Sequence, residues 1–376
     1  MSKERISILK GAKRILVKIG SGVLTGQDGL DLDIIEHLVD EMADYSKKGF
    51  HFVIVSSGAI ASGMNRMGFR ERLKSLPQKQ AAAAIGQGRL MRVYSNAFGR
   101  HGLVTAQILL TMSDLTDRQR FLNIRNTLST LTEWGVVPII NENDSVSVDE
   151  IKFGDNDNLA AMMANITGAN ILINLTNTDG LYDRDPRGPE KSRLISLVTE
   201  ITAEIEEAAS SEPDTVGMGG MKSKILAARK VNAFGIPCII AYGKKNGIVG
   251  DILSGKETGT LFLPMAHHLK SKKYWIAFTL RSRGKICIDS GARDAIINQG
   301  KSLLPSGIVR VEGDFLVGDP VTCVDVNGLS IAKGLVNYSS VDIDRIKGLK
   351  TSKIEQVLGD KPYDEIIHRD NMAVSK

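Results

Sequence analysis

Residues 136–166, VVPIINENDSVSVDEIKFGDNDNLAAMMANI, join an apolar, β-branched run to a segment rich in Ala and Met. The run at 136–140 is typical of a buried strand, and the pattern at 159–166 predicts a short helix. The segments 141–144 and 154–158 between them contain seven Asn or Asp residues: Asn141, Asn143, Asp144, Asp155, Asn156, Asp157 and Asn158. Helix capping is the alternative explanation for Asp157 and Asn158, but seven such residues exceed what capping needs. The stretch therefore predicts a βα unit with a polar site at the end of its strand.

Apolar strand runs and helical patterns alternate on both sides of this stretch. The other expected strands are 14–19, 51–55, 103–109, 171–175 and 237–242. The other expected helices are 34–47, 80–98, 117–134 and 222–234. Such alternation predicts βαβ crossovers and a parallel sheet covered by helices on both faces. We therefore expect an α/β fold, a three-layer αβα sandwich with a mostly parallel sheet, over residues 1–264.

The character of the sequence changes at residues 265–275, which begin with the polar, basic stretch MAHHLKSKK and are the expected linker. Short strands are expected after it at 285–289, 307–311, 320–326 and 330–336, with one short helix at 294–298. Asn327-Gly328 is a strong signal for a β-hairpin turn. Residues 276–376 therefore read as a small, mostly-β domain.

Composition excludes several classes of protein. The net charge of +5 over 376 residues is far from the dense basic surface of a dedicated nucleic-acid binder. No run approaches the roughly 20 apolar residues that a membrane span needs. Cys238, Cys287 and Cys323 form no CxxC pair, which favours buried structural thiols and a reducing, cytoplasmic location. The six His residues show no metal-ligand spacing, so no protein-held metal site is expected.

Two Gly-rich or Ser-rich segments stand at expected strand ends, and a third runs into an expected helix. Residues 18–22, KIGSG, place a Lys beside a loop whose amides suit a phosphate, although a solvent-facing Lys before an ordinary turn fits equally. Residues 55–59, VSSGA, suit a carboxylate or phosphate, with a helix N-cap as the alternative. Residues 217–224, GMGGMKSK, suit a phosphate-binding loop before a helix, with Lys224 able to reach a γ-phosphoryl group. Their spacing is not that of a Walker A motif.

Seven motifs occur in an order that resembles the amino-acid kinase family, and in particular its members with a C-terminal PUA domain. They are VKIGSGVLTG (17–26), IVSSGAIASG (54–63), VPIINENDSV (137–146), IKFGDNDNLAA (151–161), GLYDRDPR (180–187), GMGGMKSK (217–224) and IVGD (248–251). The resemblance covers nearly the whole chain. It implies the fold of that family for residues 1–264 and a PUA-like fold for residues 276–376.

The resemblance also implies roles for individual residues. Lys18 and Lys224 match the lysines that flank the transferred phosphoryl group, and Asp157 matches the carboxylate that holds both. The positions that match the acceptor-binding residues are Ser57, Asp144 and Asn156, with Asn141 in the same motif. The positions in the nucleotide-binding segments are Lys18, Gly20, Thr176, Asn177, Met218, Gly219, Gly220, Met221, Lys222, Ser223 and Lys224. The family usually has Asp at position 177 and often Thr at position 218, so the nucleotide side departs from its pattern.

The activity that the resemblance implies is ATP-dependent phosphorylation of the side-chain carboxylate of L-glutamate, the first step of proline biosynthesis. It further implies Mg²⁺ as cofactor, proline as feedback inhibitor, and a homo-oligomer, either a dimer or a tetramer. A kinase of aspartate, acetylglutamate or a nucleoside monophosphate is an alternative, as is a nucleotide- or RNA-binding regulator without catalysis. Residues 272–376 contain 16 basic and 13 acidic residues, a surplus too small for an obvious nucleic-acid footprint.

Overall fold

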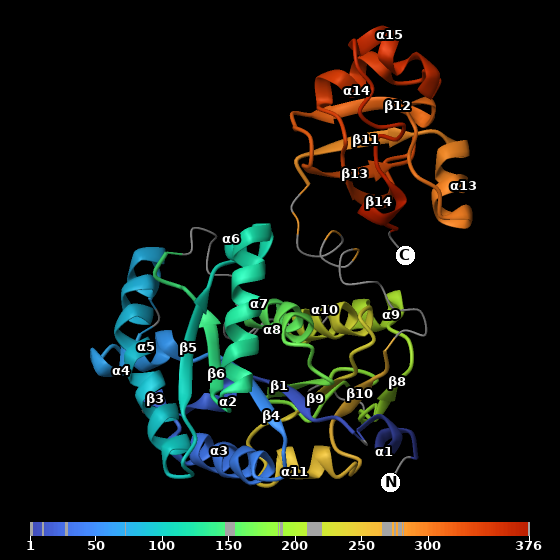
Figure 1. The fold of residues 1–376 in the computed structure, drawn as a ribbon. Helices are drawn as coiled ribbons and strands as arrows, with labels where there is room; N and C mark the ends of the chain where they lie inside the picture. The colour runs from blue at the N-terminus through green and yellow to red at the C-terminus, as the bar shows by residue number, and fades with distance from the viewer. Residues whose placement is uncertain are drawn as a thin grey trace. The chain divides into compact units, whose positions relative to one another are not determined.

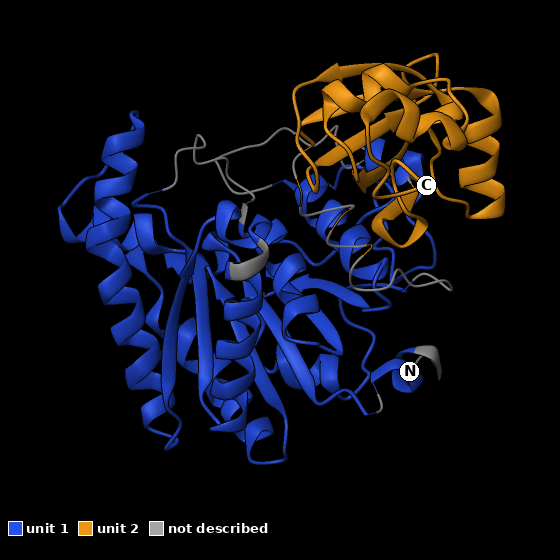
Figure 2. Ribbon diagram, turned by 45° about the horizontal axis from the view of Figure 1, so that its top comes forward, with its two compact units in different colours: residues 1–268 blue, residues 269–376 orange. Residues whose placement is uncertain are grey.

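The apolar runs of the first two thirds of the chain assemble into one sheet. The computed structural model describes residues 3–9, 11–26, 29–71, 73–146, 155–186, 188, 191–208, 220–264, 273, 276, 280 and 282–374. The chain divides into two compact units, residues 1–268 (unit 1) and residues 269–376 (unit 2), which Figure 2 shows in different colours. The predicted domain bounds of 264 and 276 fall close to this division. Apart from Lys273, the predicted linker lies outside the described residues.

The sheet of unit 1 has eight strands in the described part of the chain, in the order β5-β6-β4-β1-β7-β9-β10-β8. These strands are β1 (Arg14–Ile19), β4 (His51–Ser56), β5 (Thr105–Leu110), β6 (Val137–Glu142), β7 (Ile171–Thr176), β8 (Leu197–Val198), β9 (Cys238–Tyr242) and β10 (Thr260–Phe262). Neighbouring strands pair in parallel, except for the antiparallel pair of β9 and β10. The predicted mostly parallel sheet is confirmed.

Helices cover both faces of this sheet (Figure 1). One face carries α3 (Leu32–Ser46), α5 (Leu76–Gly99) and α11 (Ile248–Leu253). The other carries α7 (Arg118–Glu133), α8 (Asp155–Ile166) and α10 (Met221–Asn232). The shorter elements are α1 (Lys3–Leu9), α2 (Ser21–Leu24), β2 (Thr25–Gly26), β3 (Gly29–Leu30), α4 (Ala59–Arg66), α6 (Met112–Thr116) and α9 (Ala203–Ala208). The three-layer αβα sandwich is confirmed.

Side-chain alternation along β1 decides which layer the predicted catalytic lysine faces. Ile15, Val17 and Ile19 pack into the core beneath α3 and α5, whereas Leu16 packs into the core beneath α8 and α10. Successive side chains of a strand point to opposite faces, so Lys18 shares the face of Leu16. The lysine thus stands on the side of the sheet that carries α8 and α10.

The polar stretch after β6 differs from the sequence expectation at both ends. The strand extends two residues beyond the expected 136–140, through Asn141 and Glu142. Helix α8 begins at Asp155, four residues before the expected start, so the interpretation of Asp157 and Asn158 as caps is wrong. Asp and Asn are poor in helix interiors but favourable in the first turn, where their oxygens meet unpaired N–H groups and the positive end of the helix dipole. Both residues lie in that first turn.

Unit 2 has its own sheet, with five strands among its described residues in the order β12-β11-β13-β14-β15. The strands are β11 (Gly284–Ile288), β12 (Ile308–Gly313), β13 (Pro320–Val324), β14 (Ser330–Leu335) and β15 (Met372–Val374). The helices are α13 (Ser290–Gln299), α14 (Ser340–Ile346) and α15 (Ile354–Leu358). The expected mostly-β unit is confirmed, although α14, α15 and β15 were not predicted. Gly328 adopts φ 83° in the turn between β13 and β14, as the Asn-Gly signal predicts.

Two further expectations concern thiols and membranes. The three cysteines are free and buried, and burial raises the pKa of the Cys238 and Cys323 thiols, which disfavours a reactive thiolate. No helix in the described part of the chain is both long enough and apolar enough to cross a bilayer.

Candidate active site

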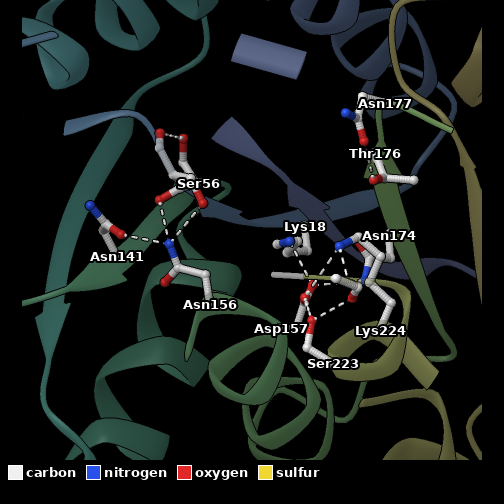
Figure 3. Close-up of polar contacts among 12 residues, drawn as sticks. Lys18, Ser56, Asn141, Asn156, Asp157, Asn174, Thr176, Asn177, Ser223 and Lys224 are labelled. Atoms are coloured by element: carbon white, nitrogen blue, oxygen red, sulfur yellow. Dashed lines mark hydrogen bonds and ion pairs between the residues drawn. The ribbon is translucent and has the colours of Figure 1, made fainter. Parts of the chain in front are cut away.

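Two buried lysines from distant parts of the chain contact one carboxylate. Lys18 near the end of β1 places its Nζ 2.6 Å from Asp157 Oδ1, and Lys224 on α10 places its Nζ 3.7 Å from Asp157 Oδ2 (Figure 3). The exposed fractions are 5% for Lys18, 7% for Lys224 and 1% for Asp157. The alternative that Lys18 faces solvent is therefore wrong. The structure brings together the three residues predicted to be catalytic.

Neutral donors complete the environment of Asp157. Asn174 on β7 donates from Nδ2 to Asp157 Oδ1 at 3.0 Å, and Ser223 on α10 donates from Oγ to Asp157 Oδ2 at 2.6 Å. Burial alone would raise the pKa of this carboxyl, but the charges of Lys18 and Lys224, with the hydrogen bonds from Lys18 and Ser223, outweigh it and lower the pKa to about 2. Asp157 is thus a fixed anion that can orient two ammonium groups.

Three of the predicted acceptor-binding residues form a second cluster around Asn156, which lies on the same helix as Asp157. Asn156, adjacent to Asp157, donates from Nδ2 to Ser57 Oγ at 2.9 Å and to Asn141 Oδ1 at 3.0 Å (Figure 3). Asn141 lies at the end of β6 and Ser57 directly after β4, so neighbouring parallel strands deliver both to one edge of the sheet. Asp144 lies half-buried in the turn after β6. No described contact places it against Ser57 or Asn156.

A helix N-cap does fall within residues 55–59, but neither serine caps the helix with its side chain. Helix α4 has Gly58 as its N-cap residue, in a left-handed conformation with φ 102°, and no side chain caps the helix. The Ser56 hydroxyl instead meets the buried Tyr94 hydroxyl at 2.9 Å and donates to the carbonyl of Ser57 at 3.1 Å. Ser57 is therefore held in place while its own hydroxyl faces Asn156.

Three residues in regular elements support these clusters and were missed by the sequence analysis. Gln87 on α5 accepts at Oε1 from Asn141 Nδ2 at 3.0 Å, Tyr94 on α5 contacts Ser56, and Asn174 contacts Asp157. A signal existed only for Asn174, since a polar residue interrupts the apolar strand ILINLT. Gln87 and Tyr94 lie in a long helix whose pattern does not distinguish a site residue from a core residue.

Among the predicted nucleotide-binding residues that the structure describes, Gly20, Gly220 and Ser223 lie beside the two lysines or Asp157. Gly20 donates its N–H to the carbonyl of Leu175, and a Cβ at Gly20 would stand 3.6 Å from Lys18 Nζ, so this glycine lies beside the first lysine. Thr176 ends β7 and donates from Oγ1 to Asn177 Oδ1 at 3.3 Å. Gly220 caps α10, whose first turn contains the buried Met221, the exposed Lys222 and then Ser223. Met218 and Gly219 lie outside the described residues.

This arrangement suits the binding of two anions side by side. Two ammonium groups and the N-terminus of α10 stand at one place, where unpaired first-turn amides favour phosphate. A cluster of amides and hydroxyls stands one residue further along α8. Among the described residues, no group of three His, Cys, Asp or Glu side chains could hold a metal ion.

Comparison with known protein families gives two matches along the chain. The model of the amino acid kinase family matches residues 13–242, and the model of the PUA domain matches residues 284–358. The first match covers more than half of the chain and contains Lys18, Asp157 and Lys224.

Full-length relatives carry one name. The chain is 68% identical over 374 residues to "Glutamate 5-kinase" from Syntrophus aciditrophicus, which covers 100% of this chain and 97% of the relative. It is 52% identical over 371 residues to "Glutamate 5-kinase" from Geobacter metallireducens, with 98% and 100% covered. A solved structure of UMP kinase from Bacillus anthracis aligns with a TM-score of 0.46 and 14% identity, over 68% of this chain and 97% of that chain.

Proposed function

The chain belongs to the amino acid kinase family, and from that premise we propose that it transfers the γ-phosphoryl group of ATP to the side-chain carboxylate of L-glutamate. The product is L-glutamyl 5-phosphate, and the reaction opens proline biosynthesis. The observation that carries the proposal is the pair of buried lysines on Asp157, beside the cluster of Ser57, Asn141 and Asn156.

The acceptor needs no general base. A glutamate side chain has a pKa of roughly 4.3 and is ionised at neutral pH. One carboxylate oxygen forms a bond to the γ-phosphorus as the bond from that phosphorus to the β,γ-bridging oxygen breaks, and ADP leaves with the electron pair. No proton is transferred in this step, so the site needs no His, and none occurs in its motifs.

The obstacle is the repulsion between an anionic acceptor and an anionic phosphate chain. Lys18 and Lys224 place two positive charges at the transferred group, where negative charge spreads over the equatorial oxygens in the transition state. Asp157 contacts both ammonium groups and holds them in place before substrate arrives. Pre-oriented donors in a site that excludes water are worth about 3 kcal/mol each in the transition state.

The amide cluster has a fixed polarity that suits the amino acid end of glutamate. The backbone N–H of Glu142 donates to Asn141 Oδ1 at 2.9 Å, which identifies that atom as the oxygen. Asn156 must then present Nδ2 to Asn141 and Ser57, and its own Oδ1 is buried without a hydrogen-bond partner in the described structure. We assign this oxygen to the binding of the α-amino acid group of the acceptor. We assign the Ser57 hydroxyl to the same group, together with the carboxylate of Asp144, which follows Asn141 in the same motif.

The nucleotide is assigned to the other side of the lysines. The first-turn amides of α10 and the glycine loop beside Lys18 suit the phosphates of ATP. Thr176, Asn177 and the segment 217–224 complete the proposed nucleotide side. Because Asp157 is fully occupied by the lysines and neutral donors, Mg²⁺ would enter as part of the MgATP substrate, with the phosphate oxygens and water as its ligands. Bound in this way, the cation neutralises phosphate charge.

Further parts of the proposal concern the protein as a whole. We assign residues 1–264 to the catalytic domain, 265–275 to a linker and 276–376 to a PUA-like domain. A cytoplasmic homo-oligomer, dimer or tetramer, with proline as feedback inhibitor agrees with a biosynthetic role. The net charge of +5 favours small-molecule partners over nucleic acid.

One assay tests the proposal. The protein is incubated with MgATP and each of L-glutamate, L-aspartate, N-acetylglutamate and UMP, ADP release is measured, and hydroxylamine traps any acyl phosphate. We expect ADP and hydroxamate with L-glutamate. Turnover with another acceptor but none with glutamate would establish a related kinase instead, and RNA binding without ADP release would establish a regulator.

A further inference from the structure

Asn174 occupies a position in β7 where an aliphatic side chain would be expected. Its exposed fraction is 0%, and β7 lies inside the sheet between β1 and β9. Leu172, two residues earlier on the same face, packs into the core beneath α8 and α10. Burying an amide in such a core is unfavourable unless its polar atoms are paired.

The pairing of this amide is incomplete. Asn174 Nδ2 donates to Asp157 Oδ1, but Asn174 Oδ1 is buried without a hydrogen-bond partner in the part of the chain that the structure describes. A leucine would fill the same strand position without an unpaired acceptor. Stability alone therefore does not explain the residue, whereas its contact with Asp157 offers a reason.

Strand register places Asn174 directly beside the first lysine. Lys18 on β1 pairs with Asn174 on β7, and in-register side chains of adjacent parallel strands share one face. Both then reach the same oxygen: Lys18 Nζ lies 2.6 Å and Asn174 Nδ2 lies 3.0 Å from Asp157 Oδ1. The other oxygen receives Ser223 Oγ at 2.6 Å and Lys224 Nζ at 3.7 Å, both from α10. Each carboxylate oxygen thus meets one ammonium group and one neutral donor.

We infer that Asn174 is a positioning residue for phosphoryl transfer, which holds the Asp157 carboxylate from the sheet side so that both lysines point at the transferred group. This inference rests on the proposed function. Because the amide comes from β7 whereas Ser223 and Lys224 come from α10, donors on two different elements fix the rotation of the carboxylate. It also stabilises the ionised form of Asp157, since a hydrogen bond to a carboxylate favours its charged state.

The first test replaces Asn174 with leucine. We expect Asn174→Leu to lower kcat by about 10- to 100-fold, as removal of such supporting contacts commonly does, with the KM for glutamate within twofold of wild type. The matched control is Asn232→Leu. Asn232 is an equally buried amide on α10 that donates to the carbonyls of Ile236 and Phe262, and this variant should keep kcat within twofold.

The pH dependence separates positioning from packing. Without the amide donor the pKa of Asp157 should rise, so Asn174→Leu should lose activity on acidification at a higher pH than wild type. In Asn174→Asp, a carboxyl that is ionised at pH 8 repels Asp157, but in its neutral acid form it donates a hydrogen bond to Asp157 Oδ1. The activity of Asn174→Asp relative to Asn174→Leu should therefore increase as the pH falls.

Failure of this inference can be told from failure of the proposed function. Absence of turnover in the wild type with every acceptor would overturn the proposed function. The pKa of Asp157 can be followed through its ¹³Cγ chemical shift, and it reports on the contact with Asn174 even in a protein that shows no turnover. A higher Asp157 pKa in Asn174→Leu supports the inference. An unchanged Asp157 pKa, or a kcat equal to that of Asn232→Leu, would overturn it.

Discussion

Asp157 keeps its negative charge in a place that excludes water, and this makes unit 1 sensitive to acid. Burial raises the pKa, and the two lysines lower it further than burial raises it, from 3.8 to about 2. A depressed pKa contributes stability that is fully present above the unfolded value of 3.8 and is lost as the pH falls from about 4 towards 2. The contribution is about 2 kcal/mol.

The first prediction follows from the lowered pKa of Asp157. The free energy of unfolding of the wild type should exceed that of Asp157→Asn at pH 6, and the difference should shrink by about 2 kcal/mol between pH 5 and pH 2. Urea unfolding followed by circular dichroism at each pH measures it. A difference that stays constant over this range would show that Asp157 is not held as a stabilised anion.

The second prediction concerns Gln87, whose Oε1 accepts from Asn141 Nδ2. Replacing it with methionine removes the acceptor at nearly constant volume, so Asn141 loses the contact that holds its amide. We expect Gln87→Met to raise the KM for glutamate by about 5- to 100-fold, with a smaller effect on the KM for ATP. Gln87→Glu keeps an acceptor and should recover part of the loss. Equal KM values for glutamate in wild type and Gln87→Met would show that Gln87 does not contribute to glutamate binding.

At the residue scale, the sequence predicted the side chains in polar or Gly-rich motifs and missed single polar residues within a buried strand or a long helix. Lys18, Ser57 and Asn141 follow apolar runs closely, where polar residues are conspicuous. Asn174 and Gln87 act through a contact with another side chain, and the contact depends on strand register and helix packing. One-dimensional patterns do not contain that information.

At the scale of elements, two glycines allow the backbones of α4 and α5 to contact each other where the helices cross. A Cβ at Gly86 would stand 1.9 Å from the carbonyl oxygen of Ala59, and one at Gly63 would stand 1.8 Å from that of Ala82. Because Ala59 is the second residue after Ser57, a displacement of α4 would move the Ser57 hydroxyl that faces Asn156. The crossing of the two helices thus contributes to the geometry of the amide cluster.

The third prediction uses this crossing. Gly86→Ala should lower the free energy of unfolding by about 1–3 kcal/mol and raise the KM for glutamate, because α4 must move away from α5. Gly88 on the same helix has nothing within 4 Å of an added Cβ, so Gly88→Ala should instead stabilise by about 0.5–1 kcal/mol and leave KM unchanged. Urea unfolding and steady-state kinetics test both variants. Similar behaviour of the two would show that the crossing has no effect on the site.

Strands and long helices were predictable because their patterns extend over many residues, whereas the start of α8 was not. The sequence 155–158 consists of Asp and Asn, which are poor helix formers in isolation. In the fold these residues form the first turn of α8, because Asp157 and Asn156 find partners on β1, β7 and the strand ends. Tertiary contacts therefore overrode local propensity at the point where the site is built.

At the scale of the whole molecule, each unit has a separate hydrophobic core. Residues such as Val17, Leu90 and Ile225 pack within unit 1, and Phe315 and Ile343 pack within unit 2. All residues assigned to catalysis and substrate binding belong to unit 1. Binding of substrates should then stabilise only that unit, since a ligand stabilises the state to which it binds.

The fourth prediction is a calorimetric one. Differential scanning calorimetry of the full chain should show two transitions, and a non-hydrolysable ATP analogue with glutamate should raise the midpoint of one of them only. Saturation at 100 times Kd corresponds to about 2.7 kcal/mol of stabilisation. An equal upward shift of both transitions would show that unit 2 takes part in substrate binding.

The central claim is that two cationic side chains, held by one shared anion, offset the repulsion between acceptor and nucleotide. The most direct measurement is kcat for the Lys18→Met, Lys224→Met double variant with MgATP and L-glutamate, in protein whose circular dichroism matches the wild type. The account predicts a loss of at least about 10²-fold, since each ammonium group contributes about 3 kcal/mol to the transition state. A kcat within twofold of wild type would contradict it.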